Sequence, residues 1–320
     1  MNILLSKKGV IKISFLLSFS LFFSWLSAER FLGVDRDYLQ YLSFFESLTP
    51  SYDGRFEIGF VGLSLFIKSL GLSFGVLLFI SALISLSQKF YLIYQGPNKA
   101  FWVVVYLLML FPLHEMTQIR ASTAIGFGYL SLFFAIRENL SVRVVVLGVL
   151  SVLFHWTLLV FIPFIVFVKF FKMRKFSIVV SLIAFPTVVT YLSLSFLSYL
   201  NPQVENIINT ASEMHANPFS SRMIIFIIII SIGMANINKI KSDFLPWFYL
   251  SVFGISFWYG MVELPVFAHR IFELTMFSCF LWVPSLPKYS RAIAMSLLAV
   301  LSIYLFINAL YLDPLFRSDL

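Results

Sequence analysis

The sequence predicts an all-α, polytopic integral membrane protein with about 9 to 11 transmembrane helices. Of its 320 residues, 60% are hydrophobic and 12% are charged, whereas soluble domains carry about 25% charged residues. The mean hydropathy is +0.93, and apolar runs of about 20 residues, the length of a membrane-spanning helix, recur along the chain. We therefore expect a single transmembrane domain over residues 1–320.

The first half of the chain alternates apolar runs with polar segments. After a short basic start, we interpret the run 13–28 as an uncleaved first helix rather than a signal peptide, because more spans follow. Residues 29–57 are the longest polar stretch, and 38–48 has the spacing of an amphipathic helix at the interface. The run 58–70 is too short for a complete span and predicts a half-spanning piece, whereas 72–94 predicts a full span.

Spans are expected next at 101–113 and 121–136. The following run, 142–171, is too long for one straight helix and is interrupted by His155 and Pro163, which predicts two short spans or a hairpin. Further spans are expected at 176–200, 222–236, 244–261, 266–284 and 292–312, with a polar loop at 201–221.

Charge sets the expected topology. The net charge of +8 does not indicate nucleic-acid binding, since basic residues in a membrane protein mainly determine orientation. We assign 15 of the 23 basic residues to cytoplasmic loops at 1–12, 88–99, 137–143, 169–175, 239–243 and 285–291. This asymmetry predicts a cytoplasmic N-terminus and places 29–57 and 201–221 on the outer side.

The basic residues assigned to the outer side are all arginines: Arg30, Arg36, Arg55, Arg120, Arg222, Arg270 and Arg317. Arginine forms planar, bidentate hydrogen bonds with phosphate and carboxylate, and lysine does not. An anionic ligand on the outer side is one interpretation, and pairing of each arginine with a nearby acid is the other. We favour ligand binding for Arg120 and Arg270, which begin apolar helices, and pairing for Arg30 and Arg317.

Short motifs follow one another along the chain: GVDRDYLQY at 33–41, FEIGF at 56–60, QIRASTA at 118–124, FHW at 154–156 and AHRIF at 268–272. Together they resemble the EpsG-like, Wzy-type bacterial polysaccharide polymerases over most of the chain. Ala121-Ser122 departs from the family pattern, in which a small hydrophobic residue and Gly often follow Gln-x-Arg. The resemblance implies a GT-C-like glycosyltransferase in the bacterial inner membrane.

Such an enzyme would join undecaprenyl-diphosphate-linked oligosaccharide repeat units on the periplasmic side. The resemblance implies the bilayer and this lipid-linked oligosaccharide as partners, and it leaves room for a chain-length regulator and a flippase. The product is O-antigen, capsule or exopolysaccharide. The alternatives are a transporter or flippase for a lipid-linked glycan, although no internal repeat is visible, and an O-antigen ligase, although the 201–221 loop is short for one.

The chemistry of glycosyl transfer assigns candidate roles. Asp35, Asp37, Glu57 or His155 would take the proton from the attacking hydroxyl. The alternatives for them are a solvated loop charge, an acid at a helix N-terminus, and a buried histidine bonded to a carbonyl. Candidates for holding the diphosphate and the sugars are Arg36, Arg55, Gln118, Arg120, Arg222, Arg270, Tyr38 and Tyr41.

We assign neither a metal nor a cofactor. Asp35 and Asp37 have the spacing that holds a metal in other glycosyltransferases, but so short a match is weak. The single Cys279 excludes an internal disulfide and a cysteine metal cluster. His114 and Glu115 are adjacent and do not share a helix face, so we expect an interfacial role rather than a catalytic pair.

The orientation is testable at Ser51, in the segment expected on the outer side. A cysteine introduced there by Ser51→Cys should react with a membrane-impermeant maleimide in intact spheroplasts. Protection of this cysteine until the membrane is opened would contradict the proposed topology.

Overall fold

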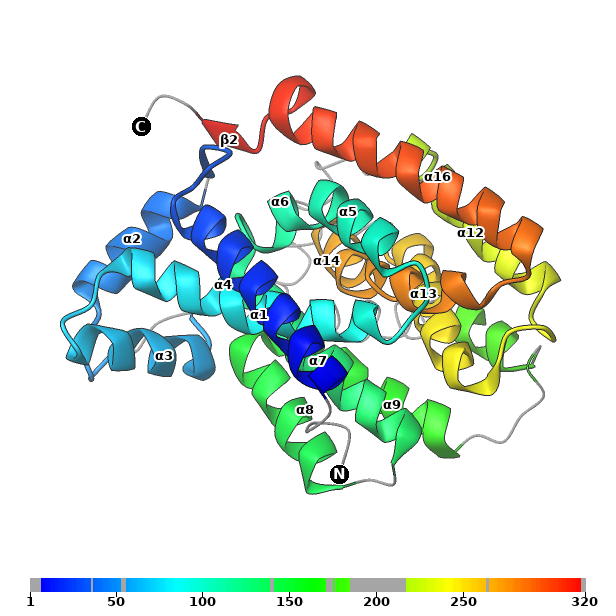
Figure 1. Ribbon diagram of the computed structural model, residues 1–320, viewed down its shortest axis with the longest axis horizontal. Helices are drawn as coiled ribbons and strands as arrows, with labels where there is room; N and C mark the ends of the chain where they lie inside the picture. The colour runs from blue at the N-terminus through cyan, green and yellow to red at the C-terminus, as the bar shows by residue number, and fades with distance from the viewer. Residues whose placement is uncertain are drawn as a thin grey trace, which may run out of the picture. The chain divides into compact units, whose positions relative to one another are not determined.

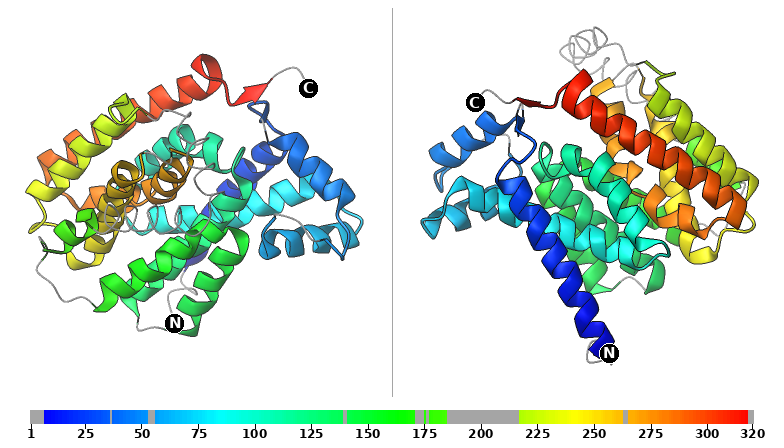
Figure 2. Two further views of the ribbon diagram at one scale, coloured as in Figure 1. Left: turned by 180° about the vertical axis from the view of Figure 1, so that it is seen from behind. Right: turned by 45° about the horizontal axis from the view of Figure 1, so that its top comes forward.

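The computed structural model describes residues 7–35, 37–52, 56–138, 141–170, 175, 177–184, 217–262 and 265–317. These residues are almost entirely helical (Figures 1 and 2), as an apolar chain requires when no water can satisfy its backbone. They confirm the all-α prediction. The chain divides into two compact units, Met1–Pro163 with Ser302–Leu320, and Phe164–Leu301.

The first unit carries most of the elements. It contains α1 (Lys7–Ala28), β1 (Val34–Asp35), α2 (Tyr38–Ser47), α3 (Ile58–Ser69), α4 (Phe74–Tyr94), α5 (Lys99–Met109), α6 (Phe111–His114), α7 (Ile119–Arg137), α8 (Val142–Phe154) and the 3-10 helix η1 (Trp156–Val160). At its C-terminal end lie the π-helix η4 (Asn308–Leu312) and β2 (Phe316–Arg317), while α9 (Phe161–Phe170) and α16 (Lys288–Ile307) continue from one unit into the other.

Helices α4, α7 and α8 form the centre of this unit. Ser85 of α4 meets Ser122 of α7 at 2.7 Å, and farther along, the rings of Tyr91 and Phe133 lie 5.9 Å apart. Later residues of α4 therefore meet later residues of α7, so the two helices run in the same direction. Helix α8 packs along α7 after a short turn, and Figure 2 shows the pair side by side in green.

Helices α2 and α3 carry the predicted interfacial segment and the predicted half-spanning piece. Helix α2 buries Tyr41, Phe44 and Phe45 on one face, and α3 is only 12 residues long. Lys68, near the end of α3, donates hydrogen bonds to the carbonyls of Phe45 and Leu48 at 3.0 and 2.9 Å. Lys68 therefore lies against the segment 29–57, which we assigned to the outer side, where we expected the basic residues to be arginines alone.

The segment that follows α1 pairs with the C-terminal part of the described chain in a small antiparallel sheet. Val34 pairs with Arg317, and Asp35 pairs with Phe316. Figure 1 shows the red arrow of β2 beside the blue segment that follows α1. This pairing fixes the start of the segment 29–57.

Three described helices are long and apolar enough to cross a membrane: Phe74–Tyr94, Ile119–Arg137 and Lys288–Leu312. The shorter apolar helices are Ser14–Ala28, Ile58–Ser69, Lys99–Met109, Val142–Phe154, Trp156–Val166 and Ser221–Ala235. These segments are those of a helical membrane protein. The predicted count of about 9 to 11 crossings stays a prediction.

The second unit contains α12 (Ser221–Ala235), η2 (Ser242–Phe244), α13 (Leu245–Gly260), α14 (Pro265–Met276), α15 (Cys279–Trp282) and η3 (Val283–Ser285). Helix α13 is buried along most of its length. A Cβ on Gly233 would lie 2.4 Å from the ring of Phe248 and 2.8 Å from that of Trp282. Only glycine therefore permits this contact between α12 and α13.

One expected loop residue belongs to a helix instead. We predicted Lys89 in a cytoplasmic loop at 88–99, but α4 continues to Tyr94 and Lys89 is fully buried. A buried ammonium needs a partner, and Glu115 supplies it at 2.8 Å. Most of the predicted span 176–200 and residues 201–216 of the predicted loop lie outside the described residues.

Candidate functional site

Three of the predicted site residues converge in the first unit. Nη1 of Arg120 donates to Oε2 of Glu57, and Nδ1 of His155 lies 2.7 Å from Oε1 of the same carboxylate. Glu57 is 63 residues from Arg120 and 98 from His155, so only the fold brings them together. The side chains of Glu57, His155 and Arg120 are 10%, 14% and 22% exposed, which leaves the cluster within reach of a ligand.

Aromatic rings complete the surroundings of Arg120. Its Nε donates to the hydroxyl of Tyr41 at 3.2 Å. The guanidinium also lies 4.6 Å from the ring centre of Phe56 and 5.5 Å from that of Tyr41, within cation–π distance. Burial raises the pKa of Tyr41 despite the nearby guanidinium, so the hydroxyl stays protonated. These contacts hold the guanidinium group of Arg120 in one orientation.

The charges of the cluster follow from its hydrogen bonds. Burial raises the pKa of Glu57, but the bond to His155 and the charge of Arg120 outweigh it and hold the pKa below its ordinary value. Glu57 is therefore an acceptor at neutral pH, and Nδ1 of His155 is the donor in their bond. In the neutral imidazole, Nε2 is then left as the basic nitrogen.

Local backbone geometry places each of these side chains. Helix α8 ends at Phe154, and His155 adopts an extended conformation with φ −159° and ψ 112° before η1 begins. The predicted interruption of 142–171 at His155 is therefore confirmed, whereas Pro163, the second predicted interruption, lies inside α9. Glu57 is extended immediately before α3, and the half-buried Gln118 immediately precedes α7. The cluster thus lies where several helices begin or end.

A glycine permits Glu57 to reach His155. Helix α3 packs against α8, and a Cβ built on Gly59 would lie 2.8 Å from the carbonyl oxygen of Leu153 and 3.0 Å from the ring of Phe154. Any larger residue at this position would push the start of α3 away from the end of α8. Gly59 belongs to the FEIGF motif, which this contact explains.

Asp35 and Asp37 form their hydrogen bonds and ion pairs with residues outside this cluster. Asp35 is buried and forms an ion pair with Arg30 at 3.2 Å, as we expected for Arg30. Its Oδ1 also accepts the backbone N–H of Asp37 at 2.8 Å. Asp37 itself is exposed just before α2, and Tyr38 stacks under the guanidinium of Arg30 at 5.1 Å. These contacts order the loop between α1 and α2.

Arg222 and Arg270 belong to the second unit. Nη2 of Arg222 donates to Nδ1 of His269 at 2.9 Å, and its guanidinium lies 5.3 Å from the ring of Phe272. Arg270 is half-buried on α14. The structure thus adds His269, which lies within the AHRIF motif, to the candidate residues of this unit. Ligand binding by Arg120 and by Arg270 stays a prediction.

The remaining predicted site residues, Arg36 and Arg55, lie outside the described residues. Within the described ranges, no group of three or more His, Cys, Asp or Glu side chains comes together as a metal site. Sequence reasoning missed the ion pair of Lys89 with Glu115. A lysine and a glutamate within apolar surroundings were the available signal, because ionisable groups there need partners.

The described residues are apolar and almost entirely helical, which is typical of a membrane protein. They bring together an arginine, a carboxylate and a histidine, groups that can take part in acid–base chemistry. The chain belongs to the EpsG family, whose model matches residues 13–317. This is a family of polysaccharide-polymerase-like proteins, which gives the chain a polysaccharide polymerase-like role in a membrane. No curated protein and no solved structure matches the chain.

The contact at Gly59 predicts a selective effect of one methyl group. Gly59→Ala should destabilise the protein by about 1–3 kcal/mol, because its Cβ meets backbone that cannot move freely. Gly62→Ala, on the same helix, is the matched control, since a Cβ on Gly62 would have no neighbouring atom within 4 Å. Thermal unfolding in detergent would measure both, and equal melting temperatures would contradict the close approach of α3 to α8.

Proposed function

We propose that this protein is a glycosyltransferase of the bacterial inner membrane, with a GT-C-like architecture. It would polymerise undecaprenyl-diphosphate-linked oligosaccharide repeat units on the periplasmic face. The observation that carries this proposal is the convergence of Glu57, Arg120 and His155 from distant segments. Membership of the EpsG family supports the same class of reaction.

The transfer forms a bond between the acceptor hydroxyl oxygen and the anomeric carbon of the donor. It breaks the bond between that carbon and the diphosphate oxygen, and the hydroxyl proton must go to a base. We propose His155 as this base, acting through Nε2. Glu57 would fix the imidazole in the required tautomer and stabilise the imidazolium, as carboxylates do for catalytic histidines elsewhere.

Arg120 would stabilise the departing diphosphate. The diphosphate gains charge as the sugar leaves, so a fixed guanidinium favours the transition state over the bound donor. The contacts with Glu57 and Tyr41 engage Nη1 and Nε, and we propose that Nη2 faces the diphosphate. Gln118, just before the same helix, would add an uncharged amide donor.

Other predicted residues would have supporting roles. Arg222 and Arg270, with the periplasmic Arg36 and Arg55, would bind further anionic groups of the two lipid-linked substrates. Tyr38 would pack against the sugars. Tyr41, predicted for the same role, is buried and would instead hold Arg120 through its hydroxyl. We propose that Asp35 orders the loop before α2 through its pair with Arg30, while Asp37 contacts substrate.

Deletion of the gene, followed by gel electrophoresis of the cell-surface polysaccharide, tests the proposed function. The deletion strain should show single repeat units in place of a ladder. Loss of all repeat units from the outer surface would instead indicate a flippase or another transporter. Free polymer that no longer reaches its final acceptor would indicate a ligase.

Arg120→Ala should lower polymerisation by about a hundredfold or more, the typical loss for one preorganised donor, while the protein still accumulates in the membrane. Arg120→Lys should recover little, because a point charge does not reproduce the planar fork. Arg143→Ala, at an exposed position of α8, is the matched control and should keep a normal ladder. A normal ladder from Arg120→Lys would defeat this role and leave Arg120 as a structural partner of Glu57.

The proposed base predicts an order among acid–base variants. Glu57→Gln and His155→Asn should each lower turnover strongly, and the double variant should be little worse than the more severe single variant, since the two residues act as a unit. Asp35→Asn should instead lower the amount of folded protein. Ladders normalised to membrane protein would measure these effects. Normal turnover in Glu57→Gln together with loss in Asp35→Asn would assign the base to Asp35.

A further inference from the structure

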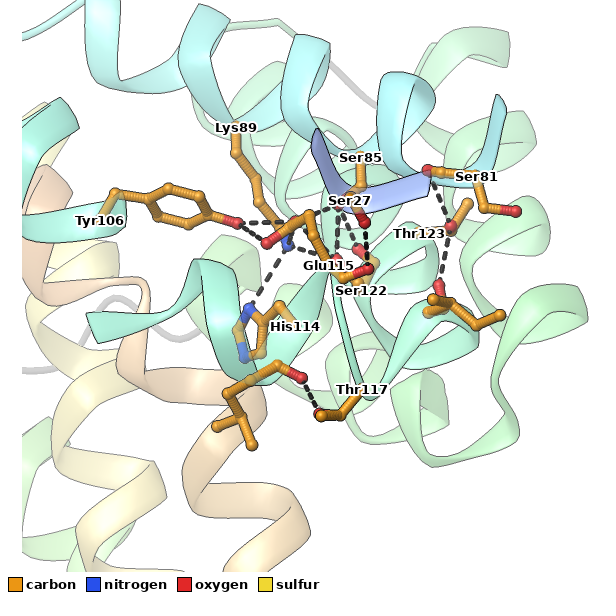
Figure 3. Close-up of polar contacts among 12 residues, drawn as sticks. Ser27, Ser81, Ser85, Lys89, Tyr106, His114, Glu115, Thr117, Ser122 and Thr123 are labelled. Atoms are coloured by element: carbon orange, nitrogen blue, oxygen red, sulfur yellow. Dashed lines mark hydrogen bonds and ion pairs between the residues drawn. The ribbon is translucent and has the colours of Figure 1, made fainter. Parts of the chain in front are cut away.

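A second polar cluster lies inside the first unit, and its members are fully or almost fully buried. Lys89, Tyr106 and His114 are 0% exposed, and Glu115 is 1% exposed. Figure 3 shows these side chains converging from α4, α5, α6 and the segment between α6 and α7. No ligand can reach groups so deeply enclosed, so the role of this cluster must be exerted through the chain itself.

The carboxylate of Glu115 is surrounded by donors. Four donors lie within hydrogen-bond distance of Oε1: Lys89 Nζ at 2.8 Å, Tyr106 OH at 2.7 Å, Ser85 Oγ at 2.9 Å and Ser122 Oγ at 2.7 Å. Tyr106 OH is also 2.7 Å from Oε2. The carboxylate stays close to all of these donors only in a narrow range of positions, so they fix Glu115 relative to α4, α5 and α7.

The ammonium group of Lys89 is equally committed. Besides Glu115, it lies 2.8 Å from Ser122 Oγ and 3.4 Å from His114 Nδ1. The acceptors thus surround it on the side of α6 and α7 (Figure 3). A hydrophobic contact of the same area would allow α4 and α7 to slide along each other. These directional hydrogen bonds instead specify a single register between α4 and the start of α7.

The segment fastened in this way leads directly to Arg120. The carbonyl of Glu115 accepts a hydrogen bond from the hydroxyl of Ser27 at 2.7 Å. The carbonyl of Met116 accepts one from Nη1 of Arg30. On the far side of Arg120, Ser122 is bonded to Lys89. The backbone is therefore held both before and after the residue whose guanidinium reaches Glu57.

We propose that the Lys89–Glu115 pair is a positioning device for Arg120, which holds the beginning of α7 so that the guanidinium meets Glu57 and Tyr41. A buried ion pair is weak evidence of stability, since apolar residues of similar volume often stabilise as well or better. What it adds is a defined geometry. The catalytic consequence rests on the proposed function, but the positional consequence does not.

The positional claim is tested by thermal unfolding of the full-length protein. Arg120→Ala, Glu57→Gln and the double variant form a mutant cycle whose non-additivity reports their contact. Non-additivity is expected in the wild-type background and should disappear when Lys89→Met and Glu115→Gln are both present, a combination that leaves no buried charge at the pair. Persistence of the non-additivity in that background would overturn the inference, and so would its absence in the wild type.

Two further backgrounds keep the test decisive. Leu132→Ala, at a position 1% exposed on the same helix, destabilises through lost packing and should preserve the contact between Arg120 and Glu57. Tyr106→Phe removes one donor to Glu115 without removing a charge, and it should weaken the contact between Arg120 and Glu57. This background can be measured even if the paired variant at Lys89 and Glu115 fails to accumulate. Equal loss of non-additivity in Leu132→Ala would show general loosening and defeat the proposal.

Turnover provides the second readout. The paired variant at Lys89 and Glu115 should lower polymerisation per folded protein by about a hundredfold, as small displacements of a catalytic group do. It should have no further effect when Arg120→Ala is already present, whereas a merely structural defect would add to it. Normal ladders in all of these variants, with the stability coupling still lost, would contradict the proposed function and leave the positioning role intact.

Discussion

The carboxylate of Glu57 joins a guanidinium and an imidazole that the chain supplies from distant segments. In a protein this apolar, a charge with no partner is costly, so the location of Glu57 constrains everything that contacts it. Helix α3 must begin against the end of α8, which requires glycine at position 59. Helix α7 must begin where Arg120 can reach the other oxygen of the carboxylate.

The sequence could predict the elements of this arrangement but not their pairing. Long apolar runs predicted α4 and α7, and an interruption at His155 predicted the break after α8. Glu57, Arg120 and His155 were each singled out as polar residues bordering apolar runs. Their meeting could not be derived, because a separation of 98 residues along the chain carries no information on distance in space.

The errors have a common physical origin. Counting basic residues assigned Lys89 to a cytoplasmic loop, yet its ammonium is buried against Glu115. Charge statistics describe lysines that remain in water, and they fail where a specific acid compensates for burial. Asp35 illustrates the same point: its loop suggested a solvated carboxylate, but Arg30 lies 3.2 Å away and both are buried. In each case the missing information was the partner.

Two ion pairs of the first unit, Lys89–Glu115 and Arg120–Glu57, are chemically alike and differ in their access to the surroundings. Lys89 and Glu115 have side chains that are 0% exposed, so their bonds can be exchanged for no others and serve only to fix the chain. Arg120 and Glu57 are 22% and 10% exposed. An arriving anion can therefore compete with Glu57 for the guanidinium. Its electrostatic attraction to the guanidinium is stronger here than in water, because the surroundings have a low dielectric constant. In the proposed mechanism, the rigid enclosed pair lets the accessible pair keep its geometry when a ligand binds. A guanidinium that moved with its ligand would stabilise the bound donor as well as the transition state, and no rate would be gained.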